Sequence, residues 1–146
     1  MKIAIASDHA GWEIKDKVSE MIRALGHEVV DHGPASAERV DYPDFAEKVS
    51  RSVQSSSEEK GILICGSGIG MSMAANRYEG VRAVIAVTGL QARMARLHND
   101  ANVLCLGARF SGLSVIEEIV NEFLNTEFEG GRHGGRVAKI DSCAQS

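Results

Sequence analysis

Short apolar runs alternate with longer segments of helical period along this chain. Residues 2–6, 27–31, 61–65, 81–87 and 102–106 are the runs expected to form strands. Between these runs, apolar residues recur every three or four positions, which is the spacing of one helix face. These positions are Ile14, Val18, Met21, Ile22 and Leu25; Phe45, Val49 and Val53; Leu90, Met94 and Leu97; and Leu113, Ile116, Ile119, Val120, Phe123 and Leu124. This alternation is typical of a parallel sheet covered by helices on both faces.

The pattern predicts an α/β fold, a three-layer doubly wound (Rossmann-like) sheet of five parallel strands. Connections in such sheets are right-handed, and a common strand order is 2-1-3-4-5. In that order the first and third strands are neighbours, and the loops at their carboxyl ends diverge and leave a crevice. We therefore expect the chemistry to lie after Ala6 and after Cys65.

A single domain is expected over residues 1–146. The polar stretch 55–60 is only long enough for a loop between a helix and a strand. A short C-terminal helix is expected at about residues 131–142, after a glycine-rich lead. A domain of this size buries about two thirds of its unfolded surface, so it needs no metal or disulfide to hold it together.

Composition narrows the classes of function. The formal net charge of −4 argues against broad binding to nucleic acid or to an anionic membrane. The three cysteines are an odd number without CxxC spacing, and Cys65 and Cys105 lie in apolar strand-like runs, which suits a reducing cytoplasm. Because Met1 leads directly into the first strand and no apolar run is long enough to span a bilayer, we expect a soluble cytoplasmic protein.

Two unusual loops coincide with the predicted crevice. Residues 7–11 read Ser-Asp-His-Ala-Gly, and residues 65–72 read Cys-Gly-Ser-Gly-Ile-Gly-Met-Ser. Glycines at alternate positions let backbone amides converge on one point, and a following helix adds the positive end of its dipole, so the second loop is expected to bind an anion. The same amides would stabilise a thiolate, which makes Cys65 a candidate base or nucleophile.

Each of these residues also has an ordinary structural interpretation. Cys65 could fill the core, the glycine loop could be a tight turn, Asp8 could cap a helix, and His9 could be a loop histidine. Their common position at the carboxyl ends of adjacent strands favours a functional interpretation.

Two further polar clusters remain open to either interpretation. Residues 97–102 end a helix before the last strand, and polar capping of that helix explains them as well as a functional role does. A helix end before a parallel strand lies at the amino side of the sheet, away from the crevice, unless the segment folds back across the top. Arg132 and Arg136 are four residues apart on one helical face amid glycines. Such a pair suits a phosphate, although a solvated pair is the usual explanation.

Eight stretches in order along the chain carry a resemblance to a known family: residues 7–11, 41–43, 61–70, 74–77, 82–83, 98–104, 107–109 and 129–133. Together they resemble the family of ribose-5-phosphate isomerase B and the galactose-6-phosphate isomerase subunits. The resemblance spans nearly the whole chain, and its specificity comes from the combination of stretches in this order.

The resemblance implies a cofactor-independent aldose–ketose isomerase that interconverts ribose 5-phosphate and ribulose 5-phosphate through an enediolate, in the pentose phosphate pathway. Cys65 falls on the family's carbon acid–base, which moves a proton between C2 and C1. His98 falls on its ring-opening histidine, with Asp8 nearby, and Ser67 falls on a position that is often threonine and helps to manage the enediolate oxygens. Some members instead use a glutamate six positions after the cysteine; because that position is Met71, this chain resembles the cysteine type.

Binding roles also follow from the resemblance. Substrate and phosphate contacts fall on His9, Tyr42, Gly66, Gly68, Ile69, Gly70, Asn99, Arg109, Arg132 and Arg136. The site in this family lies between subunits, which implies a homodimer or a tetramer. We expect no metal and no other cofactor, because the reaction involves no net redox change and the histidines lack HExxH or similar spacing.

Four other functions share some features with this sequence. An isomerase of a hexose 6-phosphate, such as allose or galactose 6-phosphate, uses the same bond chemistry and is not excluded by the sequence. A non-catalytic nucleotide-binding domain is disfavoured, since residues 66–70 read GxGxG rather than GxGxxG and follow the third strand. A cysteine phosphatase would need arginine where Met71 stands. A phosphoacceptor signalling domain would need a carboxylate at the end of the third strand, where Cys65 stands.

Overall fold

The computed structural model describes residues 1–143. Its strands form one five-stranded parallel sheet, as the apolar runs predict. The strands are β1 (Lys2–Ser7), β2 (Glu28–Asp31), β3 (Lys60–Cys65), β4 (Ala83–Ile85) and β5 (Val103–Gly107), and the helices are α1 (Trp12–Ala24), α2 (Tyr42–Gln54), α3 (Ile69–Ala75), α4 (Gly89–Asn99), α5 (Leu113–Asn125) and α6 (Arg132–Cys143). The expected α/β class is confirmed.

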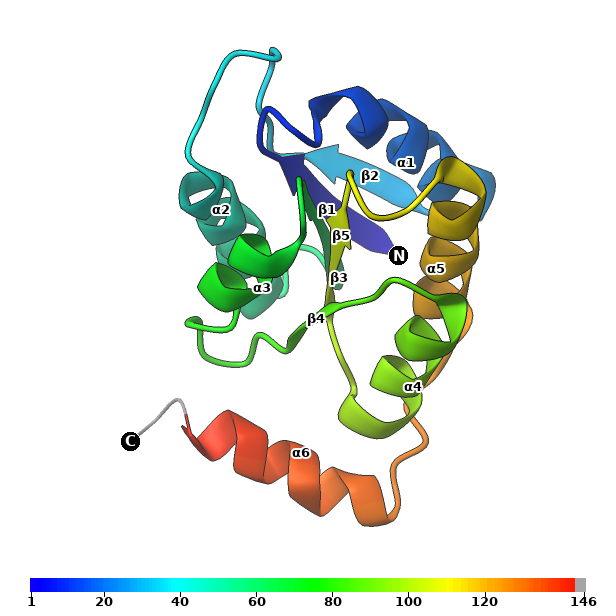
Figure 1. Cartoon of the computed structure of the whole chain (residues 1–146). Helices are drawn as coiled ribbons and strands as arrows, with labels where there is room; N and C mark the ends of the chain where they lie inside the picture. Colours follow the sequence, from blue (N-terminus) through cyan, green and yellow to red (C-terminus); the bar gives the residue numbers. More distant parts are fainter. Residues whose placement is uncertain (144–146) are drawn as a thin grey trace.

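The sheet separates two hydrophobic cores, and Figure 1 shows helices on both of its faces. Helices α1, α4 and α5 cover one face, where Ile22 and Phe123 pack with Ile62 of β3. Helices α2 and α3 cover the other face, where Val49 and Met71 pack with alternate residues of the same strands. Because the central strands are buried on both faces, they read as continuous apolar runs in the sequence.

The strand order is β2-β1-β3-β5-β4, so the expected order 2-1-3-4-5 is wrong at its last two positions. All five residues of β5 are buried, and β5 lies between β3 and β4. Strand β4 has three residues, all partly exposed, and forms the edge. Both strands are apolar, but the five-residue β5 buries more apolar area in the central place than the three-residue β4 would, which leaves the short strand outside. The neighbours β1 and β3 are as expected, so the predicted crevice keeps its place.

Helix α4 does not bury the face that its apolar periodicity predicted. Leu90 is 63% exposed and Met94 is also exposed, whereas the small residues Ala92 and Ala95 are buried against the core. The larger apolar side chains of this helix therefore lie on the surface of the chain.

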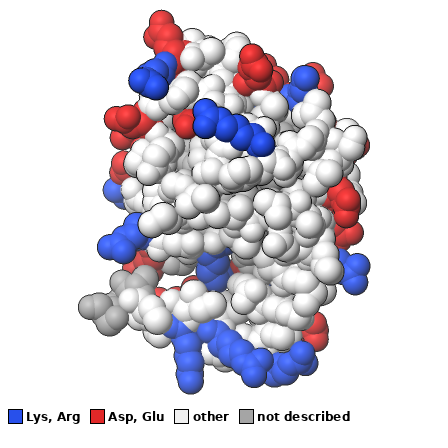
Figure 2. All heavy atoms as spheres, in the orientation of Figure 1, with Lys and Arg blue, Asp and Glu red and all other residues white. Residues whose placement is uncertain are grey.

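Helix α6 lies apart from the sheet, at the lower end of the molecule in Figure 1. It packs against α4, with His133 and Val137 buried, and the ion pair between Arg82 and Asp141 at 3.1 Å ties it to the segment before β4. Figure 2 shows a hollow next to this helix and basic side chains gathered below it. No helix among residues 1–143 is long and apolar enough to cross a membrane.

Candidate active site

Cys65 is the last residue of β3, and its sulfur is buried against the loop that follows. The backbone amide of Gly68 donates a hydrogen bond to Sγ of Cys65 at 3.1 Å. Gly68 has φ of 77°, in the left-handed region, and a Cβ there would lie 3.2 Å from the backbone carbon of Leu106. Glycine is therefore required at this position, because it alone lets the amide turn toward the sulfur without strain. A donated hydrogen bond of this kind stabilises negative charge on the sulfur.

The buried thiol of Cys105 provides a contrast. It lies in the same core as Cys65, on the neighbouring strand. Burial, and secondarily the charge of Cys65, raises the pKa of the Cys105 thiol. Cys105 therefore stays protonated and acts as a small hydrophobic core residue.

The loop after β5 packs directly on the glycine loop. Ala108 and Arg109 donate backbone hydrogen bonds to the carbonyl oxygens of Cys65 and Gly66, at 2.8 and 3.0 Å. The guanidinium of Arg109 lies over Gly66, where a Cβ would approach it within 3.4 Å. Ser67 accepts a hydrogen bond from the amide of Ile69 at 3.1 Å, so its own hydroxyl proton is free to point elsewhere. Two loops thus fix a guanidinium, a hydroxyl and a thiol beside one another.

Asp8 is buried at the end of β1, next to this loop. Its Oδ1 accepts from the amides of Ala10 and Gly11 at 2.9 and 3.1 Å, and its own amide donates to Ile64 of β3. Asp8 is not the N-cap of α1, which is Gly11, and its carboxylate instead closes the turn at residues 8–11. These bonds also fix the carboxylate at the mouth of the crevice.

His9 and Tyr42 border a hollow of about 530 Å³ that also reaches Asp8. The amide of Val40 donates to Nδ1 of His9 at 3.3 Å. A proton on Nε2 is thereby favoured, and that N–H is available to an anion. The ring of Tyr42 lies against Gly70, where a Cβ would come within 2.5 Å of it. A side chain at Gly70 would therefore displace this ring.

Lys15 anchors the segment between β2 and α2, which leads into Tyr42. This role was not predicted from the sequence. Its ammonium is buried beneath the segment and donates to Asp31 at 2.9 Å and to the carbonyl of Pro34 at 2.8 Å. The available signal was a lysine on the apolar face of α1, three residues before Val18. Arg39, which lines the same hollow as His9, was also missed.

The other predicted residues lie at the opposite end of the sheet. His98 and Asn99 end α4, just before β5 begins at Val103, whereas Cys65 pairs with Gly107 at the far end of β5. Four residue steps of strand, about 13 Å, therefore separate these two ends. Within one chain, the structure groups Asp8, His9, Tyr42, Arg109 and the loop 65–70, and it does not bring His98, Asn99, Arg132 and Arg136 to them.

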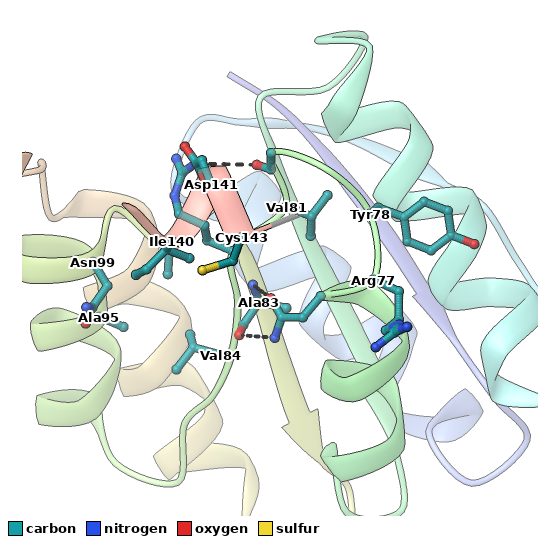
Figure 3. A pocket seen from close by; sticks show the side chains of 14 residues that line it. Arg77, Tyr78, Val81, Ala83, Val84, Ala95, Asn99, Ile140, Asp141 and Cys143 are labelled. Atoms are coloured by element: carbon teal, nitrogen blue, oxygen red, sulfur yellow. Dashed lines mark hydrogen bonds and ion pairs between the residues drawn. The ribbon is translucent and has the colours of Figure 1, made fainter. Parts of the chain in front are cut away.

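This second group has its own surroundings. Asn99 lines a cavity of about 690 Å³ between α6, the segment around β4 and the end of α3 (Figure 3), and Cys65 is not among the residues that line it. Arg132 and Arg136 lie on the exposed helix α6. The imidazole of His98 stacks on that of His133, with ring centroids 4.3 Å apart. Glu129 lies beside both rings.

Comparison with known proteins places the chain in a family of sugar isomerases. The family model described as Ribose/Galactose Isomerase matches residues 3–140, and the chain therefore belongs to this family. It is 42% identical over 144 residues to ribose-5-phosphate isomerase B of Escherichia coli, covering 99% of this chain and 97% of that protein.

Solved structures agree with this assignment. The ribose-5-phosphate isomerase B of Clostridium thermocellum is 46% identical, with a TM-score of 0.97, covering 99% of this chain and 98% of that chain. The enzyme of Mycoplasma genitalium, solved with bound ribulose-5-phosphate, is 45% identical, with a TM-score of 0.95, covering 99% of this chain and 97% of that chain.

Proposed function

We propose that this protein is a cofactor-independent aldose–ketose isomerase that interconverts ribose 5-phosphate and ribulose 5-phosphate through an enediolate. The observation that carries the proposal is the thiol of Cys65, placed at the carboxyl end of β3 with the amide of Gly68 against its sulfur. The relatives named above carry the same activity in their names, and one of them was solved with ribulose-5-phosphate.

Cys65 is the carbon acid–base in this mechanism. As a thiolate it takes the proton from C2 of the opened aldose and returns it to C1 of the enediolate, while the hydroxyl proton of O2 passes to O1, and these transfers together leave the neutral ketose. A thiol needs only a small stabilisation of its charge to act as a base near neutral pH. The reverse reaction uses the same proton transfers in the opposite order.

The developing charge is held by the loop after β3. Backbone amides of the loop 66–70 that do not already donate to Cys65 or Ser67, together with the hydroxyl of Ser67, donate to the enediolate oxygens. One fixed donor of this kind contributes about 3 kcal/mol to the stability of a charged transition state. Because the loop is pinned to residues 107–109, these donors need little rearrangement when the charge appears.

The remaining polar residues bind and open the substrate. His9 and Arg109 contact the phosphate together with Arg132 and Arg136, and Tyr42 lines the sugar. His98 opens the furanose ring, with Asp8 and Asn99 contacting its oxygens. Binding energy from the phosphate orients the reacting carbons.

A homodimer, which could pair further into a tetramer, brings the two groups of residues together. Each crevice at Cys65 receives His98, Asn99, Arg132 and Arg136 from the partner subunit. Large exposed apolar side chains surround the crevice loops: Ile69 and Met73 on α3, the latter 68% exposed, and Phe110 after β5. Such side chains are favourable where a second copy covers them.

The finer assignments complete the proposal. We place the enzyme in the cytoplasm and in the pentose phosphate pathway, as a single domain over residues 1–146, with no cofactor. The buried free cysteines at 65 and 105 suit a reducing compartment. Residues 144–146 lie outside the described part of the chain.

Substrate choice is tested by comparing kcat/KM for ribose 5-phosphate, allose 6-phosphate and galactose 6-phosphate. We expect the pentose to be preferred, because the distance between the thiol and the phosphate-binding groups is fixed by packed loops. A preference for either hexose phosphate would overturn the pentose assignment and favour the hexose alternative.

A further inference from the structure

The imidazole of His98 is flanked by two side chains to which the mechanism above gives no role. His98 and His133 stack with an angle of 15° between their rings. Oε2 of Glu129 lies 3.9 Å from Nε2 of each imidazole. Three side chains, from the end of α4, the loop between α5 and α6 and the start of α6, therefore form one compact cluster.

The backbone fixes this cluster independently of the side-chain contacts. The amide of Glu129 donates to the carbonyl oxygen of Leu97, the residue before His98, at 3.1 Å. His133 is only 6% exposed, and its Nε2 has no hydrogen-bond partner among residues 1–143. A carboxylate is thus tied next to His98, and a buried ring supports the imidazole from one side.

Electrostatics agrees with a supporting role for His133. Burial of its ring, followed by the charges of His98 and Arg132, lowers the pKa of His133. A neutral ring at neutral pH can stack beneath His98 without repelling it when His98 carries a proton. Glu129 can accept an N–H from His98 after a shift of about 1 Å, since contacts of this kind often tighten when substrate binds.

We propose that Glu129 and His133 are positioning residues for His98 in opening the sugar ring. This inference rests on the proposed function. Glu129 accepts the Nε2 proton of His98, which leaves Nδ1 to face the substrate. Nδ1 takes the proton of the C1 hydroxyl, the C1–O4 bond breaks as the C1 carbonyl forms, and O4 receives that proton from the imidazolium. The imidazole ends neutral, as it began.

The same three residues could be suspected of binding a metal ion, because their ligand atoms lie within 4.8 Å of one another. The stacked rings argue against this use. The nitrogen lone pairs lie in the ring planes, and nearly parallel planes do not direct them to one point. Two ligands of one tetrahedral zinc also lie only about 3.3 Å apart, given Zn–N bonds of about 2.0 Å.

The test separates ring opening from proton transfer at carbon. Ribulose 5-phosphate cannot close a furanose ring, because its C5 oxygen is esterified, so deuterium exchange at its C1 in D2O needs Cys65 but no ring opening. For Glu129→Gln we expect turnover of ribose 5-phosphate to fall about tenfold or more, while this exchange stays within about threefold of wild type. Glu127→Gln, which removes an exposed charge two residues away, should change neither rate.

His133 is tested by two substitutions. His133→Phe keeps a flat ring beneath His98 and should retain most of the turnover, whereas His133→Ala should lose it and keep the exchange. A second measurement does not depend on solvent exchange: the isotope effect with C2-deuterated ribose 5-phosphate should fall toward one in Glu129→Gln, as ring opening becomes limiting.

Each contrary outcome has its own meaning. Unchanged turnover in Glu129→Gln, or equal losses of turnover and exchange, would overturn the positioning roles. Wild-type protein with neither turnover nor exchange would instead overturn the proposed function. Loss of activity in EDTA that zinc restores in wild type but not in Glu129→Gln would replace the positioning cluster with a metal site.

Discussion

The amide of Gly68 lies 3.1 Å from the sulfur of Cys65, and the left-handed conformation of this glycine directs it there. This contact connects the backbone of the loop to the chemistry of the thiol. It also explains why the glycine after Ser67 is needed, beyond its place in a turn.

Gly68→Ala should therefore damage both stability and catalysis. A Cβ at φ of 77° costs about 1–2 kcal/mol of unfolding free energy, and relief of that strain moves the amide away from Cys65. We expect kcat to fall by about tenfold or more, on the scale of a lost charge-stabilising donor. Urea unfolding and steady-state kinetics measure the two effects.

Gly80→Ala is the matched control. Gly80 has φ of 75°, but no atom lies within 4 Å of its Cβ position, and it is remote from the thiol. The same backbone strain should lower stability by a similar amount and leave kcat unchanged. If Gly68→Ala loses no more activity than Gly80→Ala, the role of the Gly68 amide is wrong.

The proposed two-subunit site predicts complementation between inactive variants. Cys65→Ala and His98→Asn should each have little turnover when pure. In mixed dimers, one of the two sites combines an intact Cys65 with an intact His98 from the other subunit. Random reassociation of equal amounts should restore about a quarter of wild-type turnover, since half of the dimers are mixed and each has one working site.

The control is each variant dissociated and reassociated alone, which should remain inactive. An absence of rescue, in a mixture whose mixed dimers are verified by mass spectrometry, would place His98 and Cys65 in the same subunit's site.

Stability should fall as the solution is acidified below about pH 6.5. Burial lowers the pKa of His133 and of His27 in the folded chain. The unfolded chain therefore binds more protons between the folded and unfolded pKa values, so stability is complete above the unfolded pKa and declines below it. Thermal unfolding from pH 5 to 8 should show a shallower decline for His133→Phe and for His27→Gln than for wild type. Parallel curves would show that these rings do not contribute.

Most of the fold could be predicted because strands buried on both faces leave continuous apolar runs. The central place of β5 could not be predicted in the same way. Strand order depends on how completely each strand is buried, and residues 81–87 and 102–106 are both apolar runs. Exposed Leu90 and Met94 had the helical spacing of a core face, but periodicity identifies an apolar stripe without saying what covers it.

The proximity of Cys65 and Asp8 could be predicted from the sequence. The loop at Cys65 and the turn at Asp8 adjoin strands that are neighbours in the sheet, so topology alone brings them together. His98 ends a helix at the other end of the sheet, and no property of a single chain places it near the thiol. Glu129 and His133 belong to a stretch that carries the family resemblance, but their contact with His98 could not be predicted, because it depends on where α6 turns, which spacing along the sequence does not express.

The central claim is tested most directly by Cys65→Ala, with Cys105→Ala as the control that removes the other buried thiol. We expect Cys65→Ala to bind ribose 5-phosphate with an affinity close to that of wild type, measured by calorimetry, and to lose isomerisation by at least about a hundredfold, while Cys105→Ala keeps its turnover. Full turnover by Cys65→Ala would contradict the account, because the carbon proton would then be moved by another group.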